Sequence, residues 1–304
     1  MQGYVATIGM FDGLHKGHQF VLQQVVECAR KRGLQSMAIT FDHTNRRAPV
    51  LTPLDEKLIL LSKTSIDRVE VLPFTPELRQ MTAQQFMHQV LQERLNVKVL
   101  LTGYDNRFGH NREDGFDDYV RYGQALGIEV ISLPPAPPSL APRLASPSTH
   151  TLSSSLIRKL LQEGRVSEAA EGLGYPYTIM GRVAHGEHIG TRLGFPTANI
   201  VPADAQQLIP APGVYAVKVR LENSVEQKHG MMNIGHRPTF DGQRQTLEVN
   251  IFQLHENLYD QLLLVAFVER LRDEQRFDDV EALKQQLQRD VIAAKEALKV
   301  EGEK

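Results

Sequence analysis

The feature that most constrains the fold is a change of pattern halfway along the chain. Residues 4–133 alternate short apolar runs with amphipathic stretches, whereas residues 178–271 contain short apolar runs separated by Gly, Pro, Asn and Asp turns. A chain of 304 residues is also long enough for roughly two domains. The change predicts two domains of different architecture, over residues 1–177 and 178–304.

Five runs in the first half are apolar and rich in β-branched residues, which is typical of buried strands. Amphipathic helical patterns lie between them. Buried strands joined by helices predict a Rossmann-like, doubly wound parallel sheet, in which ligands bind beyond the carboxyl ends of the strands. The predicted strands are residues 4–9, 36–41, 67–74, 97–103 and 129–133, and the helical patterns cover residues 19–33, 54–62, 83–95 and 117–127.

A proline-rich segment ends this alternation. Residues 134–149 hold six of the sixteen prolines, which excludes a central strand or a helix interior. The composition fits a surface flap and an interdomain linker equally well. Two helices are predicted after it, over residues 151–164 and 165–174, each ending at a glycine.

The second half has the strand and turn spacing of a small antiparallel barrel. Its strand patterns are residues 178–184, 213–221, 229–235, 246–254 and 262–271. A helix is predicted over residues 279–298, with one apolar face that we expect to pack against the barrel. That face consists of Val280, Leu283, Leu287, Val291, Ala294 and Leu298.

Composition excludes several classes of protein. A formal net charge of -2 provides no basic field for sequence-independent nucleic-acid binding. The single cysteine, Cys28, excludes an internal disulfide and a multi-cysteine zinc site. The first residues lack the pattern of a signal peptide, and no run approaches the roughly 20 apolar residues that span a bilayer. We therefore expect a cytoplasmic protein with no membrane segment.

The segment GMFDGLHKGH, residues 9–18, follows the first predicted strand, and a helical pattern begins near Gly17. Glycines allow a ligand to approach the backbone, and a helix N-terminus attracts anions. His15 and His18 at this turn can donate hydrogen bonds to phosphoryl oxygens and stabilise charge as a nucleophile attacks phosphorus. Two alternatives are a pair of core histidines and a metal site, although the latter lacks a third ligand and the H-E-x-x-H spacing.

These residues resemble the H-x-G-H signature of the nucleotidyltransferase superfamily, in the F-D-G-x-H-x-G-H form of bacterial bifunctional riboflavin kinase/FMN adenylyltransferases. TGYDNRFG at 102–109 and LSSSLIR at 152–158 are similar to the family's G-x-D-F-x-F-G and I-S-S-T-x-I-R segments, in the family's order. The resemblance implies an enzyme that joins FMN to AMP, with His15 and His18 as catalytic residues. Its implied nucleotide-binding residues are Gly9, Phe11, Gly17, Asp105, Ser153, Ser154 and Arg158.

Two positions depart from the family pattern. The chain reads FDHTNRR at 41–47, where the family commonly has F-D-P-H-P, and Asn106 stands where the family often has an aromatic residue. Both departures concern the flavin side of this domain. The alternative they raise is a domain that acts on another nucleotide or has lost its activity.

The densest segment of the second half is GRVAHGEHIGTRLGFPTANI, residues 181–200. Its glycines permit tight turns, and Thr197 and Asn199 offer oxygen ligands suited to Mg²⁺. The segment contains neither a P-loop nor the protein-kinase motifs. Without further information, a glycine-rich hairpin with exposed polar residues is an equal interpretation.

The same segment resembles the riboflavin kinase signature, which implies a six-stranded antiparallel barrel with a terminal helix. Further similar segments are GVYAV at 213–217, NIGHRPTF at 233–240, LEVNIF at 247–252, LYD near 258 and RLRDEQRF at 270–277. Together, the two resemblances imply one chain that converts riboflavin to FMN and FMN to FAD, with ATP as co-substrate and Mg²⁺ as cofactor. A second alternative, from a different class of protein, is a flavin- or nucleotide-binding regulator without turnover.

The resemblance also implies roles for individual residues of the second half. Glu248 is the expected general base for the riboflavin 5'-hydroxyl, although a lone strand glutamate is more often simply exposed. Arg272 is expected either at the ligand or paired with an acid such as Glu274. The implied Mg-ATP ligands are Gly190, Thr197 and Asn199, the last two at the metal, and the implied flavin-binding residues are Asn233, Arg237 and Arg272.

Overall fold

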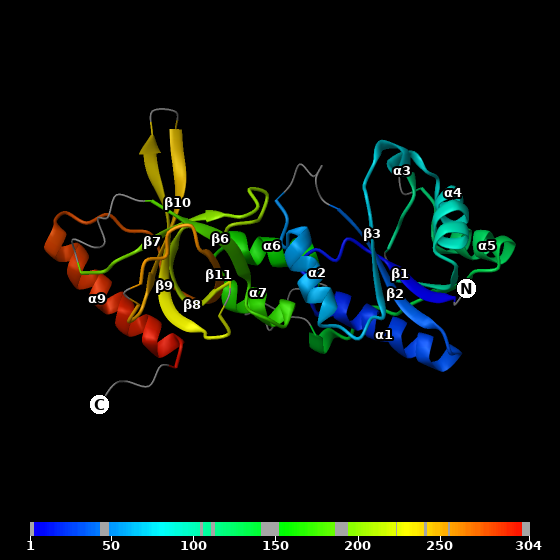
Figure 1. Ribbon diagram of the computed structural model, residues 1–304, viewed down its shortest axis with the longest axis horizontal. Helices are drawn as coiled ribbons and strands as arrows, with labels where there is room; N and C mark the ends of the chain where they lie inside the picture. The colour runs from blue at the N-terminus through cyan, green and yellow to red at the C-terminus, as the bar shows by residue number, and fades with distance from the viewer. Residues whose placement is uncertain are drawn as a thin grey trace. The chain divides into compact units, whose positions relative to one another are not determined.

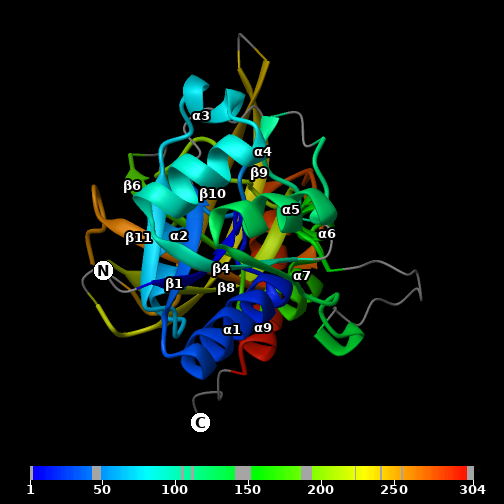
Figure 2. The same ribbon diagram turned by 90° about the vertical axis from the view of Figure 1, so that its right-hand side faces the viewer.

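The computed structural model describes residues 3–42, 49–103, 106–110, 113–140, 152–185, 194–222, 224–239, 242–254 and 256–299, without the side chains of 237–239 and 242–244. The chain divides into two compact units, most of whose helices and strands are labelled in Figures 1 and 2. The first unit holds Met1–Ala141 and Thr151–Ser154, and the second holds Pro142–His150 and Ser155–Lys304.

The first unit is built on a five-stranded parallel sheet with the order β3-β2-β1-β4-β5. In its centre, Tyr4 pairs with Gln35 and Ile8 with Ile39. The doubly wound sheet is confirmed. Its elements are β1 (Tyr4–Ile8), α1 (Lys16–Arg32), β2 (Gln35–Phe41), α2 (Leu54–Ser62), β3 (Arg68–Leu72), α3 (Pro76–Gln80), α4 (Ala83–Gln85), the π-helix η1 (Phe86–Arg94), β4 (Val97–Thr102), α5 (Phe116–Leu126), β5 (Glu129–Ser132) and a short 3-10 turn (Pro138–Leu140).

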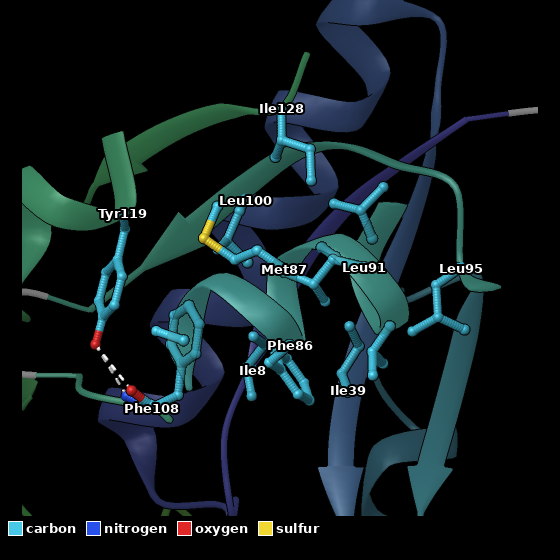
Figure 3. Close-up of a cluster of buried hydrophobic side chains, with 14 of the residues drawn as sticks. Ile8, Ile39, Phe86, Met87, Leu91, Leu95, Leu100, Phe108, Tyr119 and Ile128 are labelled. Atoms are coloured by element: carbon cyan, nitrogen blue, oxygen red, sulfur yellow. Dashed lines mark hydrogen bonds between the residues drawn. The ribbon is translucent and has the colours of Figure 1, made fainter. Parts of the chain in front are cut away.

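Helices cover both faces of this sheet. On one face, Met87 and Leu91 of η1 pack in a buried cluster with Ile8 and Leu100 of the central strands (Figure 3). On the other face, helix α1 contributes Val25 to a second cluster with β1 and β4. Burial on both sides explains why these strands are continuous apolar runs in the sequence.

The strand order reverses between β1 and β4, so the sheet has a topological switch point there. Ligands bind at such points, outside the carboxyl ends of the strands. Residues 9–15 leave β1 at this edge and lead into α1. The helix begins at Lys16, slightly before the position that the sequence pattern indicated, because the side chain of His15 caps it.

The second unit contains a closed six-stranded barrel with the order β10-β7-β6-β11-β8-β9. The predicted barrel and terminal helix are confirmed. The sequence pattern had revealed five of these strands, and β7 lies inside the glycine-rich segment 181–200. The elements are α6 (Ser154–Gln162), α7 (Val166–Leu173), β6 (Thr178–Ala184), β7 (Ala198–Pro202), β8 (Gly213–Leu221), β9 (Lys228–Thr239), β10 (Gly242–Ile251), β11 (Leu262–Arg272) and α9 (Val280–Ala297).

The terminal helix α9 packs on the barrel mainly through its C-terminal half. Ala294 and Leu298 are buried in a cluster with Ala216 and Met231. The expectation that Val280 shares this face is wrong, because Val280 is 64% exposed in the first turn of the helix.

Helices α6 and α7 form as predicted, and Gly164 and Gly174 after them have φ of 75° and 85°. Both helices lie almost entirely in the second compact unit, where Ser167 Oγ donates to Val268 O over 2.9 Å. The two compact units therefore meet in the sequence near residue 154. The predicted boundary between the two functional domains, near residue 177, stays a prediction. The choice between flap and linker also stays open, since residues 141–150 lie outside the described residues.

Candidate functional site

The turn between β1 and α1 has a strained backbone. Phe11, Gly13 and Leu14 have φ of 48°, 79° and 33°, a region that only glycine adopts easily. The side chains of Phe11 and Leu14 are buried, at 2% and 3% exposure, so packing offsets the strain. Such strain is typical of functional turns.

Asp12 holds this turn in shape. Its Oδ1 accepts hydrogen bonds from the backbone N–H groups of Leu51 at 2.9 Å and Thr52 at 3.1 Å. In return, the hydroxyl oxygen of Thr52 accepts from the N–H of Gly13 at 2.7 Å. The buried aspartate therefore supports the turn that carries the histidines.

His15 and His18 lie side by side at the start of α1, with stacked rings 3.7 Å apart. The backbone N–H of His18 donates to Nδ1 of His15 over 3.3 Å, which leaves the proton of neutral His15 on Nε2. A Cβ on Gly17 would lie 3.1 Å from the His15 ring. Glycine between the histidines therefore permits this stacking.

Both imidazoles are neutral at physiological pH. Burial lowers the pKa of His15 to about 4. Burial, followed by the neighbouring His15 and the charge of Lys57, lowers the pKa of His18 well below its usual value. The edge of the Phe11 ring faces His18, whose buried Nδ1 has no hydrogen-bond partner among the described residues. Neutral imidazoles can donate hydrogen bonds to an anion without carrying a charge themselves.

Two more of the predicted phosphate-site residues lie at this turn. Gly9 follows β1 and donates its N–H to Ile39 O over 3.0 Å. The hydroxyl of Ser154 donates to the carbonyl of Asp12 over 2.8 Å, which brings the start of α6 to the turn. Ser153 directly precedes that helix.

The nucleotide-binding roles predicted for this domain all stay predictions, and the structure does not place two of the residues at the described turn. Asp105 lies outside the described residues. Arg158 is on α6 and belongs to the second compact unit. Their roles remain predictions that rest on the family resemblance.

A pocket of about 150 Å³ adjoins the turn and is lined by Gly9, Met10, Phe41, Phe74 and Asn106, among others. The Phe41 and Phe74 rings meet edge to face at 5.5 Å. The side-chain amide of Asn106 donates to the Ile8 carbonyl over 2.7 Å. The residue that departs from the family pattern thus ties the segment after β4 to the end of β1.

In the second unit, a pocket of about 340 Å³ lies against the barrel and α9. Four of the predicted site residues line it: Thr197, Asn233, Glu248 and Arg272. Its wall also includes apolar side chains, among them Phe195, Met231, Phe277, Leu283 and Leu287.

Glu248 occupies the centre of a row of polar side chains. On one side it pairs with Asn199 of β7, and on the other with Asn233 of β9. Directly opposed residues on neighbouring antiparallel strands point to the same face of the sheet. The half-buried Glu248 therefore lies between these two residues on one face of the barrel wall, and Glu248 and Asn233 line the pocket.

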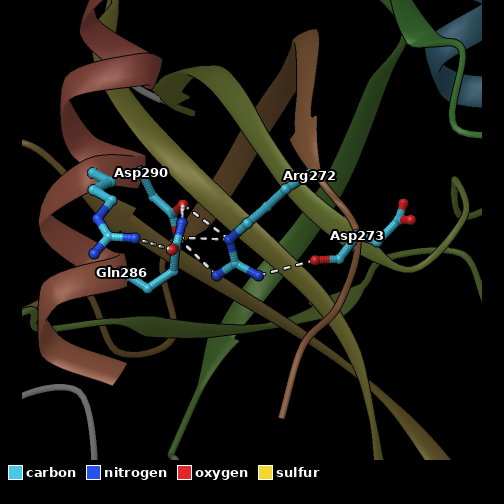
Figure 4. Close-up of polar contacts among 5 residues, drawn as sticks. Arg272, Asp273, Gln286 and Asp290 are labelled. Carbon is cyan, nitrogen blue, oxygen red and sulfur yellow. Dashed lines mark hydrogen bonds and ion pairs between the residues drawn. The ribbon is translucent and has the colours of Figure 1, made fainter. Parts of the chain in front are cut away.

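Arg272 points toward α9 and forms a bidentate pair with Asp290 (Figure 4). The two N–O distances are 2.9 and 2.7 Å, and Asp290 is 3% exposed. Gln286 also donates to Asp290 over 2.8 Å. The acid beside Arg272 is therefore Asp290, whereas Glu274 accepts from the N–H of His236.

A second pocket of the barrel, of about 320 Å³, shares Thr197 with the first. Tyr259 lines it and stacks with His185 at 4.0 Å. The amide of Asn250 donates to Pro196 O over 2.7 Å and so fixes the chain just before Thr197. Thr197 therefore lies where two pockets meet.

Two other site residues predicted for the second unit cannot be placed. Gly190 and the side chain of Arg237 are not among the described residues. Within the described part of the chain, no group of three or more His, Cys, Asp or Glu residues could hold a metal ion. The described helices include none that is long and apolar enough to cross a membrane.

Among the described residues, sequence reasoning missed three buried charged side chains, which are Asp12, Lys57 and Asp290. Lys57 is fully buried beneath the histidine turn. Its position three residues after Leu54 and four before Leu61 places it on the same helix face as these leucines, and this spacing was the available sign of burial. Asp290 lies next to the apolar face of α9, but its partner is 18 positions away in the sequence. Only the tertiary structure brings such pairs together.

Comparison with known proteins agrees with this division into two units. The family model of FAD synthetase matches residues 1–139, and that of riboflavin kinase matches residues 173–298. The chain is also similar to a solved structure described as a macrolide-efflux protein from Streptococcus pneumoniae. The TM-score is 0.84 at 30% identity, over 97% of this chain and 95% of the other.

Relatives match the chain along nearly its whole length. It is 37% identical to the bifunctional riboflavin kinase/FMN adenylyltransferase of Escherichia coli (strain K12), over 97% of this chain and 93% of the relative. It is 33% identical to that of Listeria monocytogenes, over 94% and 90%. The chain therefore belongs to the bifunctional riboflavin kinase/FMN adenylyltransferase family, with an FAD synthetase domain in its N-terminal half and a riboflavin kinase domain in its C-terminal half.

Proposed function

We propose that the barrel transfers the γ-phosphoryl group of ATP to riboflavin, giving FMN and ADP, and that the N-terminal domain joins FMN to AMP, giving FAD and pyrophosphate. The observation that carries this proposal is the contrast between a carboxylate on a barrel strand and a pair of neutral histidines at a helix start. The two activities are assigned to residues 178–304 and 1–177. ATP as co-substrate and the single cysteine favour the cytoplasm as the site of both reactions.

In the kinase, Glu248 accepts the proton of the riboflavin 5'-hydroxyl as its oxygen attacks the γ-phosphorus. The pocket that contains Glu248 takes riboflavin, because its apolar wall suits the flavin ring and the acceptor hydroxyl must reach the base. Asn233, Arg237 and Arg272 are assigned to the flavin. The second pocket takes the nucleotide base beside Tyr259, which places the phosphates near Thr197.

The residues at Thr197 also fit a magnesium ion. Asn199 and Glu248 offer oxygen atoms on neighbouring strands, and Thr197 directly precedes one of these strands. Mg²⁺ prefers one or two protein ligands together with substrate phosphates. Thr197 and Asn199 are assigned as its ligands, and Gly190 to the nucleotide. The bound ion neutralises charge on the phosphates.

In the adenylyltransferase, the phosphate of FMN attacks the α-phosphorus of ATP and pyrophosphate leaves. His15 and His18 donate hydrogen bonds to oxygens whose charge grows during that attack. No proton has to be taken from the nucleophile, because a phosphate monoester is already ionised. The residues assigned to the nucleotide are Gly9, Phe11, Gly17, Asp105, Ser153, Ser154 and Arg158.

The flavin of FMN is assigned to the pocket beside Gly9, whose wall includes Phe41 and Phe74. Aromatic rings suit a flat conjugated ligand. This pocket lies at the carboxyl edge of the sheet, next to the histidine turn.

The test is a time course of riboflavin, ATP and Mg²⁺ with the full chain, with products separated by chromatography. FMN should appear first and then decline as FAD and pyrophosphate accumulate. If the reaction stops at FMN, the adenylyltransferase activity of the N-terminal domain is rejected. The alternative is then an N-terminal domain that acts on another nucleotide. Absence of any phosphorylated flavin would favour a regulator that binds without turnover.

A further inference from the structure

Lys57 is a fully buried cation for which neither the sequence resemblance nor the proposed reactions give a role. It lies on α2, with 0% of its surface exposed. Moving an ammonium group out of water is costly unless hydrogen bonds and charge compensate it. A buried lysine at this position therefore requires a reason.

The ammonium group connects two strand ends directly beneath the histidine turn. Nζ donates to Phe41 O at 2.9 Å and to Thr40 Oγ1 at 3.0 Å, both at the end of β2. It also donates to Met10 O at 3.2 Å, which belongs to the turn after β1. Lys57 thus fixes Met10 to the edge of the sheet where the phosphates are expected.

The charge of Lys57 also reaches the histidines. It contributes to the lowered pKa of His18, after burial and the neighbouring His15. A positive charge that disfavours protonation of a nearby imidazole equally favours a nearby anion. Because Lys57 is shielded from water, solvent and salt screen this attraction less than they screen that of a surface lysine.

We propose that Lys57 is a positioning residue of the adenylyltransferase site, whose buried charge attracts the triphosphate of ATP to the histidine turn while its hydrogen bonds hold Met10. This inference rests on the proposed function of the turn. Helix α2 thereby supplies a positive charge for ATP binding. Gly9 and His15 of the turn do not supply one, because neither carries a charge.

The experiment uses Lys57→Met, which preserves the length of the side chain and removes its charge. Rates of FAD formation from FMN are measured against ATP concentration. The KM for ATP should rise roughly tenfold, corresponding to about 1.4 kcal/mol, with a smaller change in kcat. Lys63→Met, at the exposed end of the same helix, is the matched control and should leave both constants unchanged.

Riboflavin phosphorylation by the same preparation reports whether the rest of the chain is intact. An unchanged KM for ATP in a folded Lys57→Met protein, or a loss confined to kcat, would overturn the proposal. If circular dichroism shows that Lys57→Met unfolds the first domain, Thr40→Val replaces it. Loss of that hydroxyl should raise the KM for ATP about threefold or less, and an unchanged KM would overturn the proposal.

His18→Ala separates this proposal from the proposed function. If His18→Ala abolishes FAD formation and Lys57→Met leaves the KM for ATP unchanged, the role of Lys57 alone is rejected. If His18→Ala leaves FAD formation unchanged, the assignment of the turn itself is wrong.

Discussion

We propose that the histidine turn and the Glu248 pocket both act on ATP but stabilise its reaction by different chemistry. The turn contains two neutral, stacked imidazoles on a strained backbone, and its own carboxylate, Asp12, is engaged by backbone N–H groups. The barrel pocket instead has a half-buried carboxylate on a regular strand, between Asn199 and Asn233. The histidine turn offers hydrogen-bond donors, and the barrel pocket offers a proton acceptor.

The difference corresponds to the ionisation of the attacking group. A hydroxyl carries a proton that must be accepted as its oxygen attacks, so a carboxylate is needed. A phosphate is already ionised, so its site needs only donors that stabilise charge at phosphorus. On the proposed assignment of the two sites, the nucleophile, more than the shared co-substrate ATP, determines which side chains each site requires.

The largest expected effect that sharpens this comparison comes from Glu248→Gln. Glutamine keeps the shape but cannot accept the proton, so riboflavin phosphorylation should fall roughly 10²- to 10⁴-fold. FAD formation from added FMN should stay at the wild-type rate, since that nucleophile needs no base. Both rates are measured on one preparation, and a comparable fall in FAD formation would contradict the separate roles.

The next largest effect is on how the free energy of unfolding depends on pH. It comes from the buried histidines and not from the carboxylate of the barrel pocket. The folded protein holds the pKa of His15 near 4, while the unfolded chain has the ordinary value of 6.5. As pH falls from 6.5 to 4, only the unfolded state gains this proton, so the free energy of unfolding falls, on the order of 3 kcal/mol for this residue. The stabilisation is complete above pH 6.5.

Urea unfolding of His15→Asn across this pH range measures that contribution. Asparagine still caps the helix but does not titrate, so the dependence on pH should weaken by the same amount. Wild-type protein, unfolded in parallel under the same conditions, is the reference for this dependence. An equal slope in wild type and His15→Asn would show that the imidazole is not held neutral by the fold.

The smallest effect is expected from Asp290→Asn, which acts on the barrel pocket through Arg272. The variant removes the charge that orients the guanidinium at the pocket wall. The KM for riboflavin should rise roughly tenfold, with a smaller change in kcat, because Glu248 is unaffected. Steady-state rates test this, and unchanged constants would show that Arg272 is structural only.

Much of the fold could be predicted because local patterns report burial. The strands around Val5 and Val99 are apolar on both faces, and Gly33 and Gly174 end their helices with positive φ. Strand β7 could not be distinguished by pattern, because it follows a glycine-rich segment and only Ile200 among its five residues is buried. Val280 was misplaced because helical periodicity does not reveal where a helix extends past its partner.

The site was predictable where its residues are adjacent in the sequence, as in the histidine turn. Asn199, Asn233 and Glu248 were expected separately, but only strand register puts them in one row. Lys57 looks like an ordinary surface lysine in a helix that also carries Glu56, and its acceptors come from other elements. Long-range pairing of polar groups is the information that local patterns lack.

The most direct test of the two-site account is the product pattern of His18→Ala with riboflavin, ATP and Mg²⁺, resolved by chromatography. Removing one preorganised donor should slow FAD formation roughly 10²- to 10³-fold. The account predicts that FMN forms at the wild-type rate and accumulates without conversion to FAD. FAD at the wild-type rate, or equal loss of FMN formation in a protein that circular dichroism shows to be folded, would contradict it.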